Sequence, residues 1–409
     1  MKKDILTTVG VKFALNVDGA GLSSFKSGGR LSLVFYPETE KQVVSLVGVL
    51  RNTHIGFRIL GGGTNTLIPD GGYDGIAVCL KYFKGIRLAD ADETGENHRL
   101  NIEKVKENVE NAEKTPIENR KFDAGILREN VEESTESVEK NAGISRESVE
   151  KNGETLRKNT VISRKNIAKS TEKDGKSIET LRKNAGISRE NEKFNAERAK
   201  KYGFIAADAG VSLPKLSAFA LENSLSGLEF LGGIPGTVGG GVYMNAGAYG
   251  GEIGRVLEFC DVLEVGSGRV IRLKNGESEF SYRSSVFQRR VGEYVVLRAY
   301  FALECGDAAK IKDKMNEFKK RRAESQPKEP GLGSVFKRID GVIPAILIDK
   351  AGLKGYNIGG AAVSDKHAGF IINSRGASSS DFIALKERIK AVVYEKYGIK
   401  LVEEIEILE

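Results

Sequence analysis

The sequence has no tryptophan and only three cysteines, three histidines and eight prolines among its 409 residues. Tyrosine and phenylalanine must therefore supply any stacking on a ligand ring. The cysteines, Cys79, Cys260 and Cys305, are odd in number, far apart and set among apolar residues. This usage favours reduced, buried thiols over disulfides. No second histidine or cysteine stands near His367, so we expect no metal site.

Long apolar runs are also missing. No stretch of eighteen apolar residues occurs, which predicts a chain without a membrane span. The first nineteen residues hold two lysines but are interrupted by Asp4, Lys12 and Asn16, so they lack the core of a signal peptide. Together with the cysteine usage, these absences predict a cytoplasmic protein with no membrane partner.

The charge balance is basic, with a formal net charge of +7. No zinc pattern, helix-turn-helix spelling or basic stripe interleaved with aromatics accompanies it, so we expect no nucleic-acid partner. The excess charge suits small anionic substrates or solubility. The length indicates two or three domains with a sizeable core.

Glycine is abundant, most of all in Gly227–Gly251, which reads GLEFLGGIPGTVGGGVYMNAGAYGG. Glycine reaches positive φ and lets backbone N–H groups approach a ligand closely. The stretch is typical of a wall that cradles phosphates and a ring, although a run of tight turns in a β region would also explain it.

A second glycine cluster follows the short strand expected at Phe57–Leu60, where Gly61–Ile68 reads GGGTNTLI. The patterns G-x-G-x-x-G and G-x-x-x-x-G-K-[ST] are both absent. The next element is another apolar strand, Ile76–Leu80, rather than a helix, which argues against Rossmann and P-loop sites.

As a pair, GGGTN and the distant GIPGTVGGGVYMNAGAYG resemble the flavin-binding domain of the vanillyl-alcohol-oxidase and p-cresol-methylhydroxylase type. Within that type the chain resembles the UDP-N-acetylenolpyruvoylglucosamine reductases. Three further motifs occur in the order of that family: YRSSVF, GSVFK, and KHAGF with EEIEIL near the end. The resemblance implies an α+β fold, with a two-subdomain FAD-binding domain and a C-terminal α+β substrate-binding domain.

The resemblance stops at a repetitive charged segment and resumes after it. Four related octapeptides begin at Asp123, Asn141, Asn159 and Asn184, at spacings close to whole helical turns. Low hydrophobicity and repeated glycines predict a helical or disordered arm, with a protein-binding coiled coil as an alternative. The predicted divisions are 1–95 and 202–305 for the two FAD-binding subdomains, 96–201 for the insertion and 306–409 for the substrate-binding domain.

The flanks of this arm read as strands, at Ile86–Asp90 and Phe204–Asp208, that would otherwise form a hairpin. Hairpin tips accept long insertions because closure cost rises only with the logarithm of length. Elsewhere, periodicity predicts further strands and helices. The predicted strands are Leu31–Tyr36, Val256–Val265, Val270–Leu273, Tyr294–Leu303 and Leu401–Leu408. The predicted helices are one around Val43–Leu50, then Leu213–Leu225, Ile311–Arg322 and Ser380–Tyr397. We expect Ser380 or Asp381 to cap the last of these helices and Gly398 to end it.

The resemblance implies non-covalent FAD, with NADPH as hydride donor and an enolpyruvyl UDP-sugar as substrate. The reaction would form UDP-N-acetylmuramate for peptidoglycan. By the same resemblance the cofactor-binding residues are Gly61, Gly62, Gly63, Thr64, Asn65, Gly236, Thr237, Gly239, Gly240, Asn245 and Ala248.

Three residues match the catalytic positions of the family. Arg283 would hold the substrate carboxylate, since a guanidinium fork suits that group better than lysine does. Ser334 would donate the proton, although serine after glycine is ordinarily a turn residue. Glu404 would stabilise the enolate-like state and be partly protonated. Glu403 is one residue away, and alternation in a strand would place it on the opposite face.

Further candidates for the UDP-sugar are Tyr282, Arg322, Lys337, Arg338 and His367. Two departures from the family pattern stand out. The proline that often follows GSxFK is replaced by Arg338-Ile339-Asp340, and Met244–Gly250 lacks the extra tyrosine-bearing segment of some members. The chain therefore resembles a shorter-loop subgroup.

Two rival functions are compatible with parts of this pattern. Another FAD-dependent oxidoreductase on the same scaffold would use the glycine loops without the catalytic set. A scaffold protein with a decayed flavin site would use the repeat arm to recruit partners.

Overall fold

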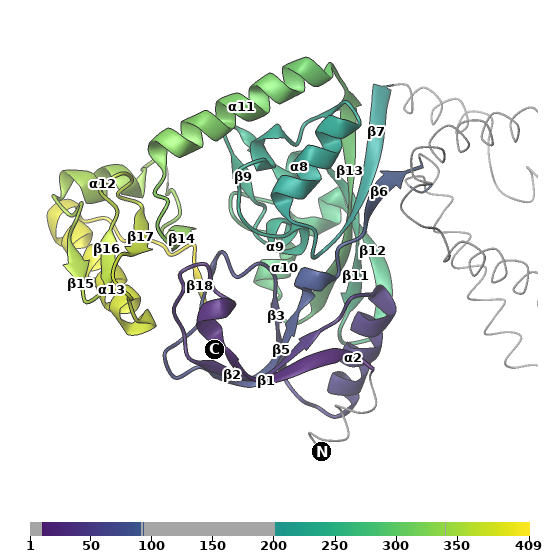
Figure 1. The fold of residues 1–409 in the computed structure, drawn as a ribbon, viewed down its shortest axis with the longest axis horizontal. Helices are drawn as coiled ribbons and strands as arrows, with labels where there is room; N and C mark the ends of the chain where they lie inside the picture. Colours follow the sequence, from purple (N-terminus) through teal and green to yellow (C-terminus); the bar gives the residue numbers. More distant parts are fainter. Residues whose placement is uncertain (1–9, 91–92, 94–200, 340) are drawn as a thin grey trace, which may run out of the picture. The chain divides into compact units, whose positions relative to one another are not determined.

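A computed structural model describes residues 10–90, 93, 201–339 and 341–409. Apart from residue 93, these belong to one compact unit, Met1–Asp90 with Lys200–Glu409 (Figure 1). The arm predicted for 96–201, with its possible protein partner, lies outside the described residues except for Lys201. Among the described residues, no helix is long and apolar enough to cross a membrane.

The first lobe is a four-stranded sheet covered by one helix. The sheet runs β1 (Lys12–Asp18), β2 (Arg30–Tyr36), β5 (Tyr73–Cys79), β3 (Phe57–Leu60). β1 pairs antiparallel with β2, whereas β2, β5 and β3 are parallel. Helix α2 (Glu40–Asn52) begins at the Thr39 cap. The predicted strands at 31–36 and 57–60 and the helix around 43–50 are confirmed, and the strand expected at 76–80 spans 73–79.

The second lobe contains a five-strand path in the order β12-β11-β13-β7-β6. β6 pairs antiparallel with β7, in a register that runs from Ile86 opposite Ala207 to Ala89 opposite Phe204. This confirms the strand pair that flanks the insertion. The strands of the lobe are β6 (Ile86–Ala89), β7 (Tyr202–Asp208), β8 (Leu225–Ser226), β9 (Gly247–Ala248), β10 (Gly251–Glu252), β11 (Leu257–Glu264), β12 (Arg269–Lys274) and β13 (Tyr294–Cys305).

Three helices accompany this sheet: α8 (Leu213–Glu222), α9 (Val238–Tyr243) and α10 (Val286–Arg289). α8 is shorter than predicted because Ser224 takes a positive φ of 55° and Leu225 enters β8. α9 lies inside the glycine-rich stretch Gly227–Gly251, so that stretch is not simply a run of turns in a β region.

A long helix, α11 (Ala308–Ser325), leads into the third lobe (Figure 1). This lobe has a sheet in the order β14-β17-β16-β15 and two helices. Its elements are β14 (Gly331–Ser334), α12 (Pro344–Lys350), β15 (Asn357–Ile358), β16 (Ala361–Val363), β17 (Phe370–Asn373) and α13 (Ser379–Tyr397).

The ends of α13 test the capping predictions. Its N-cap is Ser378, which forms a capping box with Asp381, so the prediction of Ser380 or Asp381 as the cap is wrong. Ser380 instead hydrogen-bonds Asp70 of the first lobe. Gly398 ends the helix in the left-handed region, as predicted.

The segment Leu401–Leu408 was predicted to be one strand, and only part of it is. Two residues form β18 (Glu406–Ile407), which pairs parallel with β4 (Thr66–Leu67) between the lobes (Figure 1). The preceding residues bond a different element: Lys337 donates to Val402 O at 2.8 Å and Glu404 donates to Val335 O at 2.8 Å. The segment thus changes partner half-way along.

The cysteine prediction holds in part. All three thiols are free; Cys79 and Cys260 are buried, but Cys305 is exposed, so its predicted burial is wrong. Cys305 ends β13, where the strand leaves the core. Burial raises the pKa of Cys79, and raises that of Cys260 to about 12.

Candidate active site

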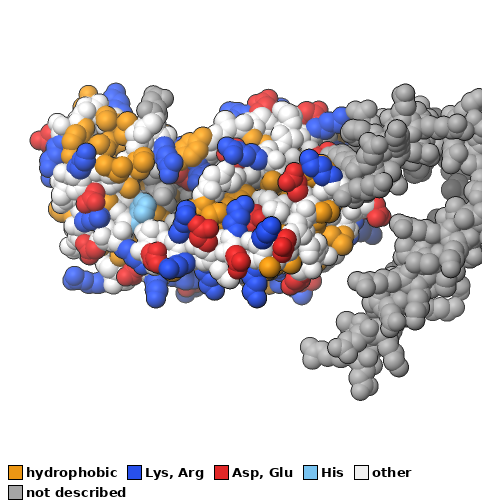
Figure 2. Space-filling view, turned by 90° about the horizontal axis from the view of Figure 1, so that it is seen from above, with side chains coloured by type: hydrophobic (Ala, Val, Ile, Leu, Met, Phe, Trp, Pro, Cys, Tyr) orange, Lys and Arg blue, Asp and Glu red, His pale blue; other side chains and the backbone are white. Residues whose placement is uncertain are grey.

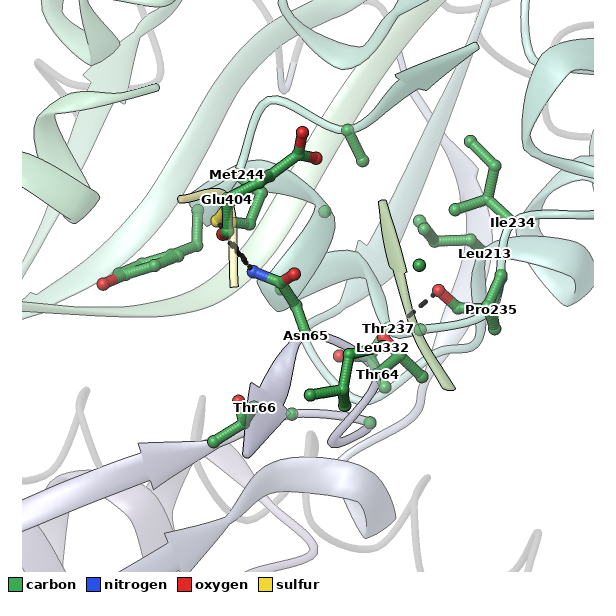
Figure 3. Close-up of a pocket in the computed structure, with 18 of the residues that line it drawn as sticks. Thr64, Asn65, Thr66, Leu213, Ile234, Pro235, Thr237, Met244, Leu332 and Glu404 are labelled. Carbon is green, nitrogen blue, oxygen red and sulfur yellow. Dashed lines mark hydrogen bonds between the residues drawn. The ribbon is translucent and has the colours of Figure 1, made fainter. Parts of the chain in front are cut away.

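Two glycine-rich loops face each other across the first and second lobes (Figure 3). Thr64 donates from Oγ1 to Pro235 O at 3.3 Å. A Cβ on Gly61 would lie 2.8 Å from Thr237 Oγ1, and one on Gly62 would lie 3.1 Å from Gly236 Cα. The close approach of the two backbones therefore requires glycine in the first loop.

A cavity of about 1650 Å³ lies along these loops and continues to the third lobe. That volume exceeds an ordinary small-molecule pocket and suits a dinucleotide together with a second ligand. Of the predicted site residues, those that line it are Gly61, Gly62, Gly63, Thr64, Asn65, Gly236, Thr237, Gly239, Gly240, Ala248, Tyr282, Arg283, Arg322, Ser334, Arg338, His367 and Glu404.

The lining fits a polar cofactor. Thr237 Oγ1 is the one buried side-chain N or O atom of the described residues that has no hydrogen-bond partner. A buried hydroxyl without a partner is costly, and a ligand oxygen at this loop would satisfy it. Because glycines let a ligand approach the backbone closely, the loop pair could hold the diphosphate of a dinucleotide.

A substitution at Gly63 tests the backbone geometry of the first glycine loop most directly. Its φ is +63° and an added Cβ would lie 1.7 Å from Leu22 O, so Gly63→Ala must displace backbone. We expect it to cost at least about 2 kcal/mol in the free energy of unfolding and to weaken dinucleotide binding. Gly71→Ala is the control, since nothing lies within 4 Å of that position. Urea unfolding and flavin titration measure both effects; equal stability of the two variants would contradict the loop geometry.

Arg283 and Glu404 meet at the cavity, where Arg283 Nε donates a hydrogen bond to Glu404 Oε1 at 2.7 Å. The guanidinium also donates to Gly247 O at 2.7 Å and to Asn245 O at 3.4 Å. Of the five N–H donors of arginine, two remain for a ligand. Arg283 has a positive φ of 52°, which is uncommon for a residue other than glycine.

Burial raises the pKa of Glu404, and the charge of Arg283 opposes only part of that rise. The carboxyl is therefore protonated up to a higher pH than an ordinary glutamate. Asn65 Nδ2 donates to the backbone carbonyl of Glu404 at 2.9 Å, which ties this residue to the first glycine loop (Figure 3).

Ser334 lies on the segment that runs beside Glu404. It ends β14, and the next residue, Val335, accepts the Glu404 N–H. Among the described residues, none hydrogen-bonds the Ser334 hydroxyl. The structure therefore brings Arg283, Ser334 and Glu404 from three distant stretches to one cavity.

Glu403 has a different environment. Its carboxylate accepts hydrogen bonds from Lys386 and Lys390 of α13, each at 2.9 Å. Burial would raise the pKa of Glu403, but these two bonds outweigh it and the pKa is lowered. Lys386 is only 4% exposed, so Glu403 neutralises a buried ammonium. The geometry favours Glu404 over Glu403 as the carboxyl that meets a ligand.

Two predicted ligand-binding residues do not line the cavity. Asn245 is fully buried; its amide donates to Ser281 O at 2.9 Å and accepts from Gly254 N at 2.8 Å. Lys337 donates from Nζ to Arg283 O at 3.2 Å. Both side chains support the backbone around Arg283, because their polar atoms are bound to the chain itself.

The remaining candidates stand along the cavity wall. The Arg283 guanidinium lies 5.3 Å from the centre of the Tyr282 ring. Arg322 donates to Gln326 at 2.8 Å and lies over the Tyr249 ring, and burial lowers its pKa. Tyr249 stacks on Phe318 at 4.8 Å. Arginine and tyrosine thus line the wall where α11 meets the second lobe.

His367 is held as a neutral side chain. Its Nδ1 accepts the Gly369 N–H at 3.1 Å, so the proton lies on Nε2. Burial, helped by the charge of Lys354, lowers its pKa. Nε2–H can therefore donate to a ligand acceptor at neutral pH. The described residues contain no group of three or more side chains suited to a metal ion.

Sequence reasoning missed a polar cluster beside the cavity, formed by Tyr243, Met244, Gln288 and Glu406. Gln288 donates to Met244 Sδ at 3.3 Å and to Glu406 at 3.5 Å. Burial, followed by the charge of Glu406, raises the pKa of Tyr243. Alternation places Glu406 on the face of Glu404 and could have suggested it. No local signal marks Gln288, which arrives through tertiary packing.

Comparisons with known proteins agree with the geometry. A family model described as FAD binding domain matches residues 31–100 and 174–274. A second, described as UDP-N-acetylenolpyruvoylglucosamine reductase, C-terminal domain, matches residues 326–408. The fold and these matches define an FAD-dependent oxidoreductase of the two-subdomain flavin-binding class, with a separate C-terminal domain.

Relatives named UDP-N-acetylenolpyruvoylglucosamine reductase align with half of this chain. The one from Caldanaerobacter subterraneus subsp. tengcongensis is 49% identical over 205 residues, which cover 67% of its length. The one from Thermosipho melanesiensis is 45% identical over 205 residues, 69% of its length. The chain belongs to the UDP-N-acetylenolpyruvoylglucosamine reductase family.

A solved structure supports the fold. The crystal structure of UDP-N-acetylenolpyruvylglucosamine reductase from Thermus caldophilus superposes with a TM-score of 0.58 at 23% identity, covering 98% of this chain and 99% of that one. The predicted α+β architecture, with a flavin-binding domain followed by the C-terminal domain of the reductase family, is therefore confirmed.

Proposed function

We propose that the protein reduces the enolpyruvyl ether of UDP-N-acetylglucosamine to UDP-N-acetylmuramate, in the synthesis of peptidoglycan precursors, with NADPH as the hydride donor. The observation that carries this proposal is the convergence of Arg283, Ser334 and Glu404 on the cavity lined by both glycine loops. An arginine, a hydroxyl and a raised-pKa carboxyl are what the reduction of an acrylate-like double bond requires from a protein.

The two glycine loops would hold FAD without a covalent bond. Gly61–Asn65 and Gly236–Gly240 would face the diphosphate, with Thr237 Oγ1 as an additional donor. When bound, FAD would supply the transfer of a hydride from NADPH to the substrate. Ala248 would contribute backbone to the same wall. Asn245 would act indirectly, by fixing the loop through Ser281 and Gly254.

Arg283 would bind the substrate carboxylate with its two remaining N–H donors and draw negative charge toward it. Its bonds to Glu404 and Gly247 fix the guanidinium plane before substrate arrives. Such preorganised donors stabilise charge in the transition state without reorganisation.

Ser334 would give its proton to the substrate carbon next to the one that receives hydride. A serine hydroxyl is a weak acid, so it serves only a strongly basic carbon and must regain the proton from solvent or a nearby group. Protonated Glu404 would donate a hydrogen bond to the enolate-like oxygen of the substrate.

The role of Glu404 predicts a pH dependence. A carboxyl that must be protonated supports turnover below its pKa and fails as pH rises through it, and here that pKa is raised. Glu404→Gln keeps an N–H donor without a titratable proton. We expect kcat about 10²-fold lower and loss of that pH limb.

Glu403→Gln is the matched control. It weakens the contacts to Lys386 and Lys390, so it will lower the thermal midpoint while keeping the wild-type pH limb. The assignment fails if the limb persists in Glu404→Gln or disappears in Glu403→Gln.

Tyr282, Arg322, Arg338 and His367 would contact the UDP-sugar, with Lys337 supporting the Arg283 backbone. We infer a cytoplasmic location. We further infer two FAD-binding subdomains at 1–95 and 202–305 and a substrate domain at 306–409. The segment 96–201 is then an insertion at a hairpin tip, and binding of a protein partner would be its separate function.

Substrate-dependent NADPH oxidation tests the reaction. Purified protein reconstituted with FAD should oxidise NADPH only when the enolpyruvyl UDP-sugar is present. Oxidation that requires oxygen instead of the sugar would indicate another FAD-dependent oxidoreductase of this scaffold. Truncation of residues 97–200 should leave turnover unchanged if the arm has no part in the chemistry.

A further inference from the structure

The segment Leu401–Leu408, called here the bridging segment, is anchored in two hydrophobic cores. Leu401 and Ile405 belong to a core built mainly by the third lobe, with Phe382 and Val393, that Phe25 and Leu67 of the first lobe also enter. Leu408 is 5% exposed and packs in a cluster of the first lobe with residues such as Leu31. Glu404 therefore lies between anchors in two different lobes.

Backbone bonds join the second half of this segment to the first glycine loop. Glu406 donates to Asn65 O and Leu408 donates to Leu67 O, both at 2.9 Å. These bonds form the parallel pair of β18 with β4. The pairing begins at Asn65, the residue that follows Gly61–Thr64 in the loop lining the cavity.

Asn65 contacts the bridging segment twice. Its carbonyl accepts the Glu406 N–H, and its side-chain Nδ2 donates to the Glu404 carbonyl at 2.9 Å (Figure 3). The backbone of Glu404 is thus held on one side by Asn65 and on the other by Val335. The Glu404 carboxyl then reaches Arg283 at 2.7 Å.

We propose that Asn65 and Leu408 are positioning residues that act through the bridging segment: they hold the Glu404 carboxyl against Arg283 and couple its position to the flavin loop. The effect on turnover rests on the proposed function of Glu404. The coupling itself does not, because it concerns the loop and the segment alone.

Coupling of this kind is reciprocal. A dinucleotide that orders the loop will stabilise the β18–β4 pair, and loss of the Leu408 anchor will weaken dinucleotide binding. A displacement of Glu404 by about 1 Å is enough to lower turnover by about 10²-fold, because the reacting groups must be aligned.

The test compares Leu408→Ala with Leu31→Ala, two truncations in the same hydrophobic cluster. Both will lower the thermal midpoint. We expect only Leu408→Ala to raise the Kd for FAD by about fivefold or more and to lower kcat by about tenfold or more with little change in KM. Leu408→Ile should restore most of both. If Leu31→Ala does not fold, Val34→Ala in the same cluster replaces it.

Hydrogen exchange of the wild-type protein gives a readout that does not depend on turnover. Adding FAD should slow exchange at the Glu406 and Leu408 amides, which bond Asn65 and Leu67. Unchanged exchange, or equal effects of Leu408→Ala and Leu31→Ala on Kd and kcat, would overturn the proposal. A wild-type protein that binds FAD with slowed exchange but does not reduce the sugar would refute the proposed function and leave the coupling standing.

Discussion

Replacing Ser334 with alanine is expected to lower kcat for sugar reduction by about 10²- to 10⁴-fold, the usual contribution of a positioned proton donor. Reduction of the bound flavin by NADPH should keep its wild-type rate, because that half-reaction requires no proton at the sugar carbon. Rapid mixing separates the two steps: NADPH bleaches the flavin, and the sugar restores its absorbance.

The structural reason lies in the freedom of the Ser334 side chain. The hydroxyl has no partner among the described residues, although the backbone beside it is fixed by Val335 and by β17. The position of the hydroxyl is therefore fixed by the backbone, while the hydroxyl itself makes no hydrogen bond to the described residues. Ser334→Cys keeps an acidic proton at this position and should retain more activity than alanine. Equal reoxidation rates in wild type and Ser334→Ala would refute the role.

Replacing Arg283 has the second large expected effect. Arg283→Met should lower kcat/KM for the sugar by about 10²- to 10³-fold, because in the proposed mechanism it removes both the partner of the substrate carboxylate and the charge that stabilises the enolate-like state. Arg283→Lys should recover little of this loss, since an ammonium cannot reproduce the bonds to Glu404, Gly247 and Asn245 together. FAD titration should give nearly wild-type affinity.

Arg289→Lys is the control for these variants. Arg289 pairs with Glu279 on the surface of the same lobe, about 42% exposed, and such pairs contribute little. Its kinetics should match the wild type. An Arg283→Lys protein with wild-type kcat/KM would show that a point charge is sufficient and would remove the argument from guanidinium geometry.

The glycine loops and the strand pair around the insertion were predictable because their signals are local. The strand pattern of Phe57–Leu60 and the GGGTN that follows it predict, within a few residues, a strand and then a loop whose backbone can be approached closely. Ile86–Ala89 and Tyr202–Asp208 each carry a strand pattern, so the pair could be inferred once the repetitive segment was set aside.

Contacts between residues far apart in the sequence explain where the structure departs from the sequence-based predictions. Nothing near Asn245 indicates that Ser281 and Gly254 occupy its amide, and nothing near Lys337 indicates that it reaches Arg283 O. The bridging segment reads as one strand by alternation, but its two halves bond different lobes.

Figure 2 shows basic and acidic side chains mixed on one face of the described part, a mixture that net charge alone does not reveal.

The choice between Glu404 and Glu403 shows where the two kinds of information meet. Alternation places these neighbours on opposite faces, yet it does not say which face meets the cavity. The pairing of Glu403 with Lys386 and Lys390, and of Glu404 with Arg283, favours Glu404. The contacts of Asn65 and Leu408 then fix the position of Glu404 between the first and third lobes.

The most direct measurement is the visible absorbance of FAD-reconstituted protein under anaerobic conditions. Flavin bands should bleach on addition of NADPH and return on addition of the enolpyruvyl UDP-sugar, with one sugar reduced for each flavin reoxidised. A protein that takes up no FAD, or a bleached flavin that the sugar leaves colourless, would contradict the account.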